Sequence, residues 1–368
     1  MRLIWFALAL VAILPSMTAP GGQWHDFSAF WDAGGTVGSQ TLTNPQLHVA
    51  WQVAHGVPQD GWWRYPPAFA YAYWPASLLP MGVGFVLNMI LMLALVAVSG
   101  VLLARIFSLP GEFAVRLTFA WTPMVAAANM GQNTPVCFVL ALWAIDALRR
   151  DRSVEAGTAI GLMLYKPTLA LPLVGLLLLR RSWRAAFVAG LAAVAWYVVS
   201  VPASGGDWLW PAAWLDGLRS AAPSEFATNA DKAVSIPGLL VRIPDLPAWL
   251  PYAAGGLIVL ASLRGLVRAP LVEAASAACL IGIVAGPRVW SYEAGLMLPI
   301  LGWAIAVGLS EPWRTRVVFF APLGSILWMV SPITRISGVA VIVCVAAILW
   351  LRRWPPLALG KKAASEAS

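Results

Sequence analysis

Charged residues are scarce in this sequence. Asp, Glu, Lys and Arg make up 11% of its 368 residues, whereas 60% are hydrophobic and the mean hydropathy is +0.77. Ordinary globular chains carry about a quarter charged residues, so this composition excludes a soluble protein. Because a segment that crosses a bilayer must satisfy its backbone polar groups internally, the sequence predicts an all-α, polytopic transmembrane helical bundle.

Cysteine and histidine are also rare, with three residues of each. Cys137, Cys279 and Cys344 all fall in apolar segments, where we expect them to act as small hydrophobic residues without disulfide or metal-ligand spacing. The histidines lack helix-face spacing with acidic residues, so neither a metal nor another cofactor is predicted. The net charge is +8, but no soluble domain carries a basic tract with interleaved aromatic residues, and nucleic acid is not an expected partner.

Apolar runs follow one another along most of the chain, and several are short for about 30 Å of hydrocarbon. Residues 3–19 could be a cleaved signal peptide, but the topology closes properly when they are counted as a span. Residues 154–165 and 168–179 could form one kinked helix or a hairpin that turns at Lys166–Pro167. The twelve candidate spans are 3–19, 82–104, 117–129, 134–148, 154–165, 168–179, 185–203, 249–263, 270–285, 294–309, 317–331 and 337–351.

The distribution of basic residues supports this layout. With a cytoplasmic N-terminus, 17 of the 24 Lys and Arg residues fall on the inside and 7 on the outside. A single span over 154–179 would place four later arginines outside, so the hairpin is favoured. Residues 1–353 are expected to form one transmembrane domain, with short interfacial helices in its outer loops 20–81 and 204–248. Residues 354–368 are expected to be a disordered cytoplasmic tail.

Both outer loops are rich in tryptophan and acidic residues. Asp26 follows the first span closely, which places it near the outer hydrocarbon boundary. A carboxylate in a partly dehydrated, aromatic-lined site has a raised proton affinity, which suits a general base. Asp26 could instead be a solvated acid or cap a short helix that begins near Ser28. Asp32, one to two turns along the same helix, is expected either to be structural or to contact the acceptor.

Three outer cations could bind an anionic group. Lys166 lies between two apolar runs, where a charge is costly unless it is paired, so a phosphate is one expected partner and Asp26 or Glu293 is another. Arg64 precedes Tyr65-Pro66-Pro67 and is placed to touch an anionic group or to snorkel at the interface. Arg288 could bind a phosphate, or it could pair with Glu293.

Uncharged polar and aromatic residues accompany these cations. Gln132 and Asn133 offer neutral hydrogen bonds, or they satisfy a helix end. Phosphate recognition needs cations, and sugar recognition typically uses aromatic stacking with acids and amides. A lipid-borne sugar phosphate meets all these demands. The predicted sugar- or acceptor-binding residues are Asp32, Tyr65, Gln132, Asn133, Trp290, Tyr292 and Glu293.

An ordered set of short motifs resembles glycosyltransferase family 87, polyprenyl-phosphate-sugar-dependent enzymes of the C-type membrane glycosyltransferase fold. The likeness covers roughly residues 1–300. The last motif, Gly286 to Glu293 (called the late motif below), carries Tyr292-Glu293 where many members have histidines. The usual Asn-x-Ser element is matched only loosely, by Asn229 and Ser235. The matching stretches are Asp26-Phe27-Ser28-Ala29-Phe30-Trp31, Tyr65-Pro66-Pro67 with Pro75, Gly131-Gln132-Asn133, Lys166-Pro167 and Gly286-Pro287-Arg288-Val289-Trp290-Ser291-Tyr292-Glu293.

The resemblance implies an inverting, metal-independent enzyme of the bacterial inner membrane, surrounded by membrane lipids, with its active site facing the periplasm or exterior. The implied donor is a polyprenyl-phosphate-linked hexose, most often mannose, and the acceptor is a lipid-linked or envelope glycan. In this hypothesis Asp26 deprotonates the acceptor hydroxyl, while Lys166, Arg288 and Arg64 stabilise the departing lipid phosphate. Glu293, Gln132 and Asn133 would orient the sugar.

Two other classes use the same residues differently. A transporter or flippase for a lipid-linked saccharide would need the phosphate-binding cations but no base, and it would carry charged residues deep in several spans. A structural partner in an envelope-assembly complex would tolerate mutation of Lys166 or Arg288. Turnover of the donor by purified protein separates an enzyme from both.

Overall fold

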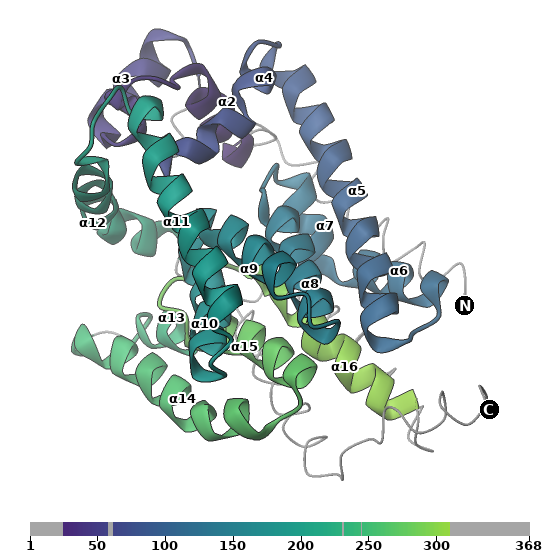
Figure 1. Cartoon of the computed structure of the whole chain (residues 1–368). Coiled ribbons are helices and arrows are strands. Elements are labelled where there is room, and N and C mark those ends of the chain that lie inside the picture. The colour runs from purple at the N-terminus through teal and green to yellow at the C-terminus, as the bar shows by residue number, and fades with distance from the viewer. Residues whose placement is uncertain (1–24, 58–61, 230–231, 244, 310–368) are drawn as a thin grey trace, which may run out of the picture.

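In the computed structural model, residues 25–57, 62–229, 232–243 and 245–309 are described, and every regular element among them is a helix (Figure 1). Candidate spans 3–19, 317–331 and 337–351, the predicted tail 354–368 and Cys344 lie outside these residues. The helices are α2 (His25–Gly35), η1 (Gln40–Leu42), α3 (Pro45–Ala54), η2 (Pro67–Ala72), α4 (Trp74–Ser77), α5 (Met81–Phe107), α6 (Gly111–Ala120), α7 (Thr122–Asn129), α8 (Thr134–Arg149), α9 (Ser153–Leu162), η3 (Met163–Tyr165), α10 (Pro167–Leu179), α11 (Trp183–Ala203), α12 (Trp210–Asn229), α13 (Ile236–Leu240), α14 (Trp249–Arg268), α15 (Leu271–Ala285), η5 (Ser291–Met297) and α16 (Leu298–Leu309).

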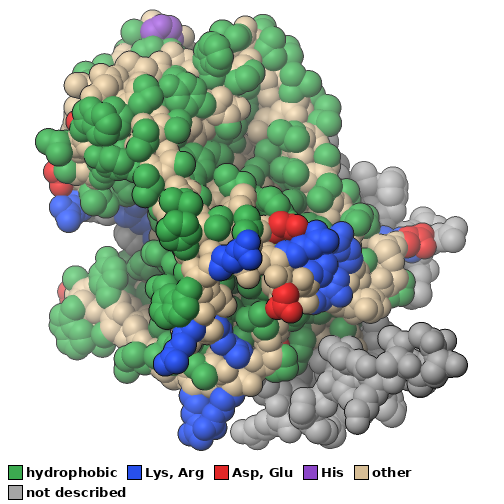
Figure 2. Space-filling view, in the orientation of Figure 1, with side chains coloured by type: hydrophobic (Ala, Val, Ile, Leu, Met, Phe, Trp, Pro, Cys, Tyr) green, Lys and Arg blue, Asp and Glu red, His purple; other side chains and the backbone are tan. Residues whose placement is uncertain are grey.

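Three described helices, α5, α11 and α14, are long and apolar enough to cross a membrane, and α10 and α15 are apolar but shorter. Each of the three long helices exposes large hydrophobic side chains, for example Ile90, Phe187 and Leu260. Apolar side chains exposed along helices of this length can contact lipid acyl chains. Hydrophobic side chains cover most of the upper part of Figure 2, whereas basic side chains gather mainly in its lower half.

The predicted span 117–129 is not one helix, which corrects the sequence-based layout. The chain breaks between α6 and α7 at Trp121, where φ is −77° and ψ is 93°, and Pro123 lies in the first turn of the new helix. The indole N–H of Trp121 donates to the carbonyl oxygen of Ala294 at 3.2 Å. This long-range hydrogen bond anchors the break inside the core. The predicted span 294–309 likewise begins inside the 3-10 helix η5, and α16 starts only at Leu298.

The chain reverses at Lys166, as the hairpin interpretation requires. A Cβ atom on Gly157 would lie 2.4 Å from the carbonyl oxygen of Ala185, and one on Gly161 would lie 2.4 Å from the Cβ of Ala192. Because the contact residues increase in number along both helices, α9 and α11 run parallel, and the start of α11 lies beside the start of α9. Helix α10 follows the end of α9 and leads to Trp183, where α11 begins, so it must run in the opposite direction. The twelve-span layout as a whole stays a prediction.

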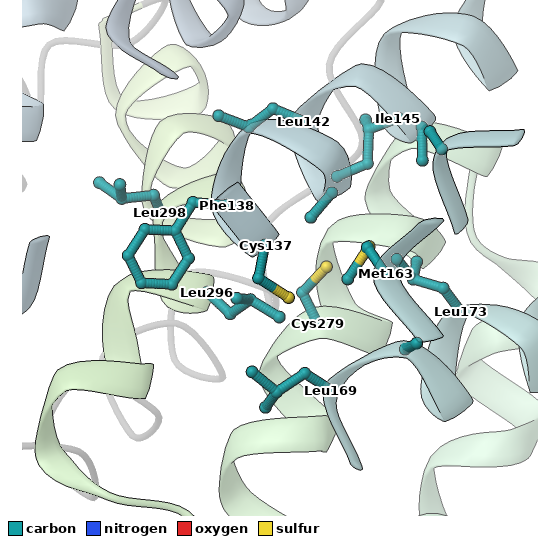
Figure 3. Packing of buried hydrophobic residues seen from close by; sticks show 14 of the residues in the cluster. Cys137, Phe138, Leu142, Ile145, Met163, Leu169, Leu173, Cys279, Leu296 and Leu298 are labelled. Atoms are coloured by element: carbon teal, nitrogen blue, oxygen red, sulfur yellow. The ribbon is translucent and has the colours of Figure 1, made fainter. Parts of the chain in front are cut away.

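The core of the bundle joins the elements that later supply the site. Cys137 of α8 and Cys279 of α15 are buried and free, and they pack with Met163, Leu169 and Leu296 (Figure 3). Both thiols therefore act as small hydrophobic groups, as predicted. At the end of α8, buried Asp146 pairs with Arg150 at 2.8 Å, Arg149 at 3.0 Å and Arg105 of α5.

Both long loops contain helices, but not only short ones. Loop 20–81 carries α2, α3, α4 and two 3-10 helices, whereas loop 204–248 carries α12, which is 20 residues long, and α13. The prediction of short helices is therefore wrong for α12. Backbone pairing fastens this second loop to the late motif, because the N–H of Val234 donates to Val289 at 3.0 Å and Ala233 bridges Trp290.

Candidate active site

A cavity of about 380 Å³ lies where the two long loops meet the ends of the bundle helices. Its wall draws residues from α2, the segment before η2, the α7–α8 turn, the η3–α10 turn, α12 and the late motif. All the predicted site residues except Asp32 and Asn133 line it, namely Asp26, Arg64, Tyr65, Gln132, Lys166, Arg288, Trp290, Tyr292 and Glu293. Residues far apart in the chain thus meet in one hollow.

Asp26 is placed in the cavity wall by the first turn of α2. Burial raises the pKa of its carboxyl group above the ordinary value, while a hydrogen bond with the Gln132 side chain and the charges of Lys232, Arg64 and Lys166 oppose that rise. A carboxylate with a raised pKa holds a proton more readily than an exposed one, which is the property of a general base.

A glycine turn holds Gln132 against Asp26. Gly131 has a φ of +73°, which favours glycine, and a Cβ atom there would lie 2.6 Å from the Cβ of Phe27. The side-chain amide of Asn88 donates to the carbonyl oxygen of Gly131 at 3.3 Å. The Gly131-Gln132-Asn133 turn therefore packs directly on α2, one residue from the candidate base.

Lys166 lies at the turn between η3 and α10 and is only 5% exposed. Its ammonium group donates to the Thr134 hydroxyl at 2.8 Å and lies 3.5 Å from Oε1 of Glu293. The same nitrogen lies 5.6 Å from the ring centroids of Tyr65 and Tyr292, a cation–π distance. The alternative pairing with Glu293 is therefore present, and two tyrosine rings hold the charge at the cavity wall.

Glu293 performs a structural task as well. Its Oε2 accepts the backbone N–H of Trp290 at 2.9 Å, and its own N–H donates to the Trp290 carbonyl at 2.9 Å. These reciprocal bonds begin η5 and fix the end of the segment that carries Arg288. The Glu293 carboxylate thus links the late motif to Lys166. This ion pair is the alternative to a phosphate partner that the sequence predicts for Lys166.

Asp32 and Asn133 lie outside the cavity lining. Asp32 is fully buried between α2 and α3, where Gln52 donates to its Oδ2 at 2.6 Å and His48 Nε2 lies 3.9 Å away. Burial raises the pKa of Asp32 to about 7 and lowers that of His48 to about 4. Asn133 is the N-cap residue of α8, but its buried side chain makes no capping hydrogen bond, and neither of its polar atoms has a hydrogen-bond partner among the described residues. The structural alternative therefore suits Asp32, whereas the expected hydrogen bond from the Asn133 side chain to a helix end is not observed.

Other lining residues received no role from the sequence. Among them are three tryptophans from the two outer loops, Trp62, Trp63 and Trp214, together with Leu215 and Leu218 of α12. The sequence signal for these tryptophans is the high density of tryptophan in both outer loops. That density does not indicate which of the indole rings line the same cavity. Among the described residues, no group of three or more His, Cys, Asp or Glu side chains could hold a metal ion. Independence from metal stays a prediction.

Comparison with known proteins identifies the family. The sequence model of glycosyltransferase family 87 matches residues 63–287, more than half of the chain. The chain belongs to glycosyltransferase family 87. This membership confirms the resemblance and makes the protein a membrane glycosyltransferase, so the transporter and structural-partner classes are no longer favoured. No curated protein and no solved structure gave a match.

The residues that the family model matches overlap with the residues that line the cavity. The matched residues include Arg64, Gln132 and Lys166, whereas Asp26 precedes the match and Arg288 follows it by one residue. The roles of individual residues therefore rest on the geometry of the cavity.

Proposed function

We propose that this glycosyltransferase moves a hexose from a polyprenyl-phosphate donor to a lipid-linked or envelope glycan, and that the hexose is mannose. The observation that carries the proposal is the shared cavity, in which Asp26 lines the same hollow as Lys166, Arg288 and Arg64. A carboxylate and a group of cations in one cavity suit a reaction in which a hydroxyl loses a proton while a phosphate gains charge.

In the proposed reaction, the acceptor oxygen forms a bond to the anomeric carbon as the bond from that carbon to the phosphate oxygen breaks. The electron pair of the broken bond stays on the leaving group. The donor phosphodiester with one negative charge becomes a polyprenyl phosphate monoester with a second charge. The proton of the acceptor hydroxyl passes to the Asp26 carboxylate, and in-line attack inverts the anomeric configuration.

The cations are suited to the developing charge. Lys166 is held by Thr134, Glu293 and two tyrosine rings, so its ammonium position is fixed before a ligand arrives. Preorganised charge stabilises a transition state more than charge that must first reorient. Arg64 and Arg288 line the same cavity and are expected to share the phosphate, since a guanidinium group can donate two parallel hydrogen bonds to its oxygens.

A lipid-borne donor also fits the surroundings of the cavity. Apolar helices long enough to cross a membrane form part of the bundle, and α12 contributes Leu215 and Leu218 to the cavity wall. We propose that the bundle completes the twelve-span, C-type arrangement in a bacterial inner membrane, with the cavity open to the periplasm or exterior. A polyprenyl chain would then stay in the bilayer while its sugar phosphate reaches the cations.

The direct test uses purified protein in lipid nanodiscs with polyprenyl-phosphate [³H]mannose, polyprenyl-phosphate [³H]glucose and the matching nucleotide-sugars. A glycolipid extract of the envelope supplies the acceptor. We expect the label to enter glycolipid from a polyprenyl-phosphate donor only, with mannose preferred. Transfer from a nucleotide-sugar alone would contradict the donor class, and transfer of glucose alone would contradict the choice of mannose.

A further inference from the structure

Three tryptophans in the cavity wall carry buried donors. The indole N–H groups of Trp62, Trp63 and Trp214 are shielded from solvent and have no hydrogen-bond acceptor among the described residues. Trp62 and Trp63 are only 6% and 1% exposed. A buried donor without an acceptor costs about 1–3 kcal/mol, and native proteins satisfy most such groups. All three residues also line the cavity, so a molecule bound there would lie beside their rings.

Helix α12 and the loop before η2 build this part of the wall together. A Cβ atom on Gly217 would lie 2.5 Å from Cη2 of Trp62, so only a glycine lets α12 approach the Trp62 ring this closely. Trp214 is on the same helix, one turn before Gly217. Lys166 and Glu293 belong to other elements, the η3–α10 turn and η5. The tryptophans and these two charged residues therefore come from different parts of the fold.

The chemistry of the α12 wall favours a neutral, hydroxylated ligand. The residues that α12 contributes to the cavity, Trp214, Leu215 and Leu218, are all uncharged. Each indole offers an apolar face and one N–H donor. A sugar ring matches both, because its C–H face packs on an aromatic ring and its oxygens accept hydrogen bonds. A phosphate would find its partners among the cations instead.

We propose that Trp62, Trp63 and Trp214 form the acceptor subsite and that the group bound there is a neutral carbohydrate ring. This inference rests on the proposed function and deepens it, since it assigns the acceptor half of the same reaction. The hydroxyl that Asp26 deprotonates then belongs to a sugar, and not to a simple lipid alcohol or a protein side chain.

The test measures ring binding by saturation-transfer difference NMR on the full-length protein in nanodiscs with saturating farnesyl phosphate. The probes are methyl α-D-mannopyranoside, methyl α-D-glucopyranoside and cyclohexylmethanol. We expect a signal from the ring protons of a methyl glycoside and none from cyclohexylmethanol. Trp62→Phe and Trp214→Phe, which remove the N–H but keep an aromatic ring, should lower the signal at least fivefold. Trp249→Phe, on the exposed surface of α14, is the matched control and should leave it unchanged.

A second variant guards against misfolding of the tryptophan variants. Gly217→Ala changes no aromatic residue but forces the Trp62 ring to move, so it should also lower the glycoside signal. Gly190→Ala, in α11 with open space around it, is the matched control for this change and should not lower it. Equal signals in wild type and the tryptophan variants, or no glycoside signal in the wild type, would each overturn the acceptor assignment.

A separate readout reports on the proposed function. Farnesyl phosphate should raise the thermal midpoint of the wild type, Trp62→Phe and Trp214→Phe proteins, but not that of Lys166→Met. If farnesyl phosphate stabilises the protein while no glycoside binds, the acceptor assignment fails and the donor site stands. If farnesyl phosphate has no effect, the proposed donor fails instead.

Discussion

Oε1 of Glu293 lies 3.5 Å from the ammonium nitrogen of Lys166, while Oε2 of the same carboxylate accepts the backbone N–H of Trp290. Both side chains are buried in the wall of the cavity. Because a buried charge is stable only with a partner, this carboxylate both pairs with the ammonium group of Lys166 and fixes the start of η5. The relation joins two motifs more than a hundred residues apart.

A double-mutant cycle tests whether this pair is coupled. Lys166→Met and Glu293→Gln should each lower stability, and together they should cost less than the sum, with a coupling free energy of about 1–3 kcal/mol. The readout is the apparent free energy of unfolding in detergent. The matched control is the exposed pair Asp216–Arg219, which is joined at 3.0 Å, where coupling should be much smaller. Equal coupling in the two pairs would contradict a preorganised lysine.

The convergence of motifs could be predicted from the sequence, and some local structure could not. From the sequence alone, alternating apolar runs and basic loops predict that Asp26, Lys166 and Arg288 lie on one side of the bundle. The break at Trp121 depends on a hydrogen bond to Ala294, far along the chain, which no local pattern signals.

The two carboxylates of α2 show a second limit. Asp26 and Asp32 are six residues apart, so at about 100° per residue they point roughly 120° apart around the helix. Only one of them can face the cavity, and helical geometry alone does not say which. Packing of α3 on α2 decides it, because Gln52 and His48 meet Asp32. Similarly, the contact of Gly217 with Trp62 depends on how two separate loops fold together.

The pH dependence of transfer should report Asp26. The base acts as a carboxylate, so kcat/KM should rise with pH through its raised pKa. The hydrogen bond from Gln132 lowers that pKa, and therefore Gln132→Leu should move the rising limb to higher pH. Gln46→Leu, on the exposed start of α3, is the matched control and should leave the profile in place. An unchanged or downward-shifted limb in Gln132→Leu would argue against Asp26 as the titrating base.

Gly131→Ala should lower both stability and activity. Its positive φ costs about 1–2 kcal/mol for a residue with a Cβ atom, and that atom would also press on Phe27 at 2.6 Å. Since Phe27 follows Asp26, the base should be displaced and transfer should fall about tenfold or more. Gly190→Ala, in α11 with open space around it, is the control and should lower neither the thermal midpoint nor the rate of transfer. Wild-type transfer by Gly131→Ala would show that this contact does not position Asp26.

Asp32→Asn should keep transfer activity, because Asp32 does not line the cavity. The pKa of Asp32 is raised from 3.8 to about 7, so between these values the native protein binds more protons than the unfolded chain. Its contribution to stability is therefore present at low pH and lost as the pH rises through about 7. The measured quantity is the thermal midpoint of Asp32→Asn minus that of wild type. This difference should be more positive at pH 7.5 than at pH 5. His48 is common to both proteins and its opposite effect cancels.

The control for this prediction is Asp245→Asn, on an exposed loop, which should show no such pH-dependent difference. A large loss of transfer in Asp32→Asn with a normal melting temperature would restore Asp32 to the reaction. A stability difference that grows as the pH falls would contradict the burial of its carboxyl group.

The account depends most on Asp26 as the base in a cavity that separately binds the donor phosphate. The decisive measurement compares Asp26→Asn with wild type in nanodiscs for two properties, farnesyl phosphate binding and the single-turnover rate of hexose transfer, with Asp245→Asn as the control. We predict that Asp26→Asn binds farnesyl phosphate as wild type does and transfers at least a thousandfold more slowly, in line with removal of a catalytic base. Transfer by Asp26→Asn at the wild-type rate would contradict the account.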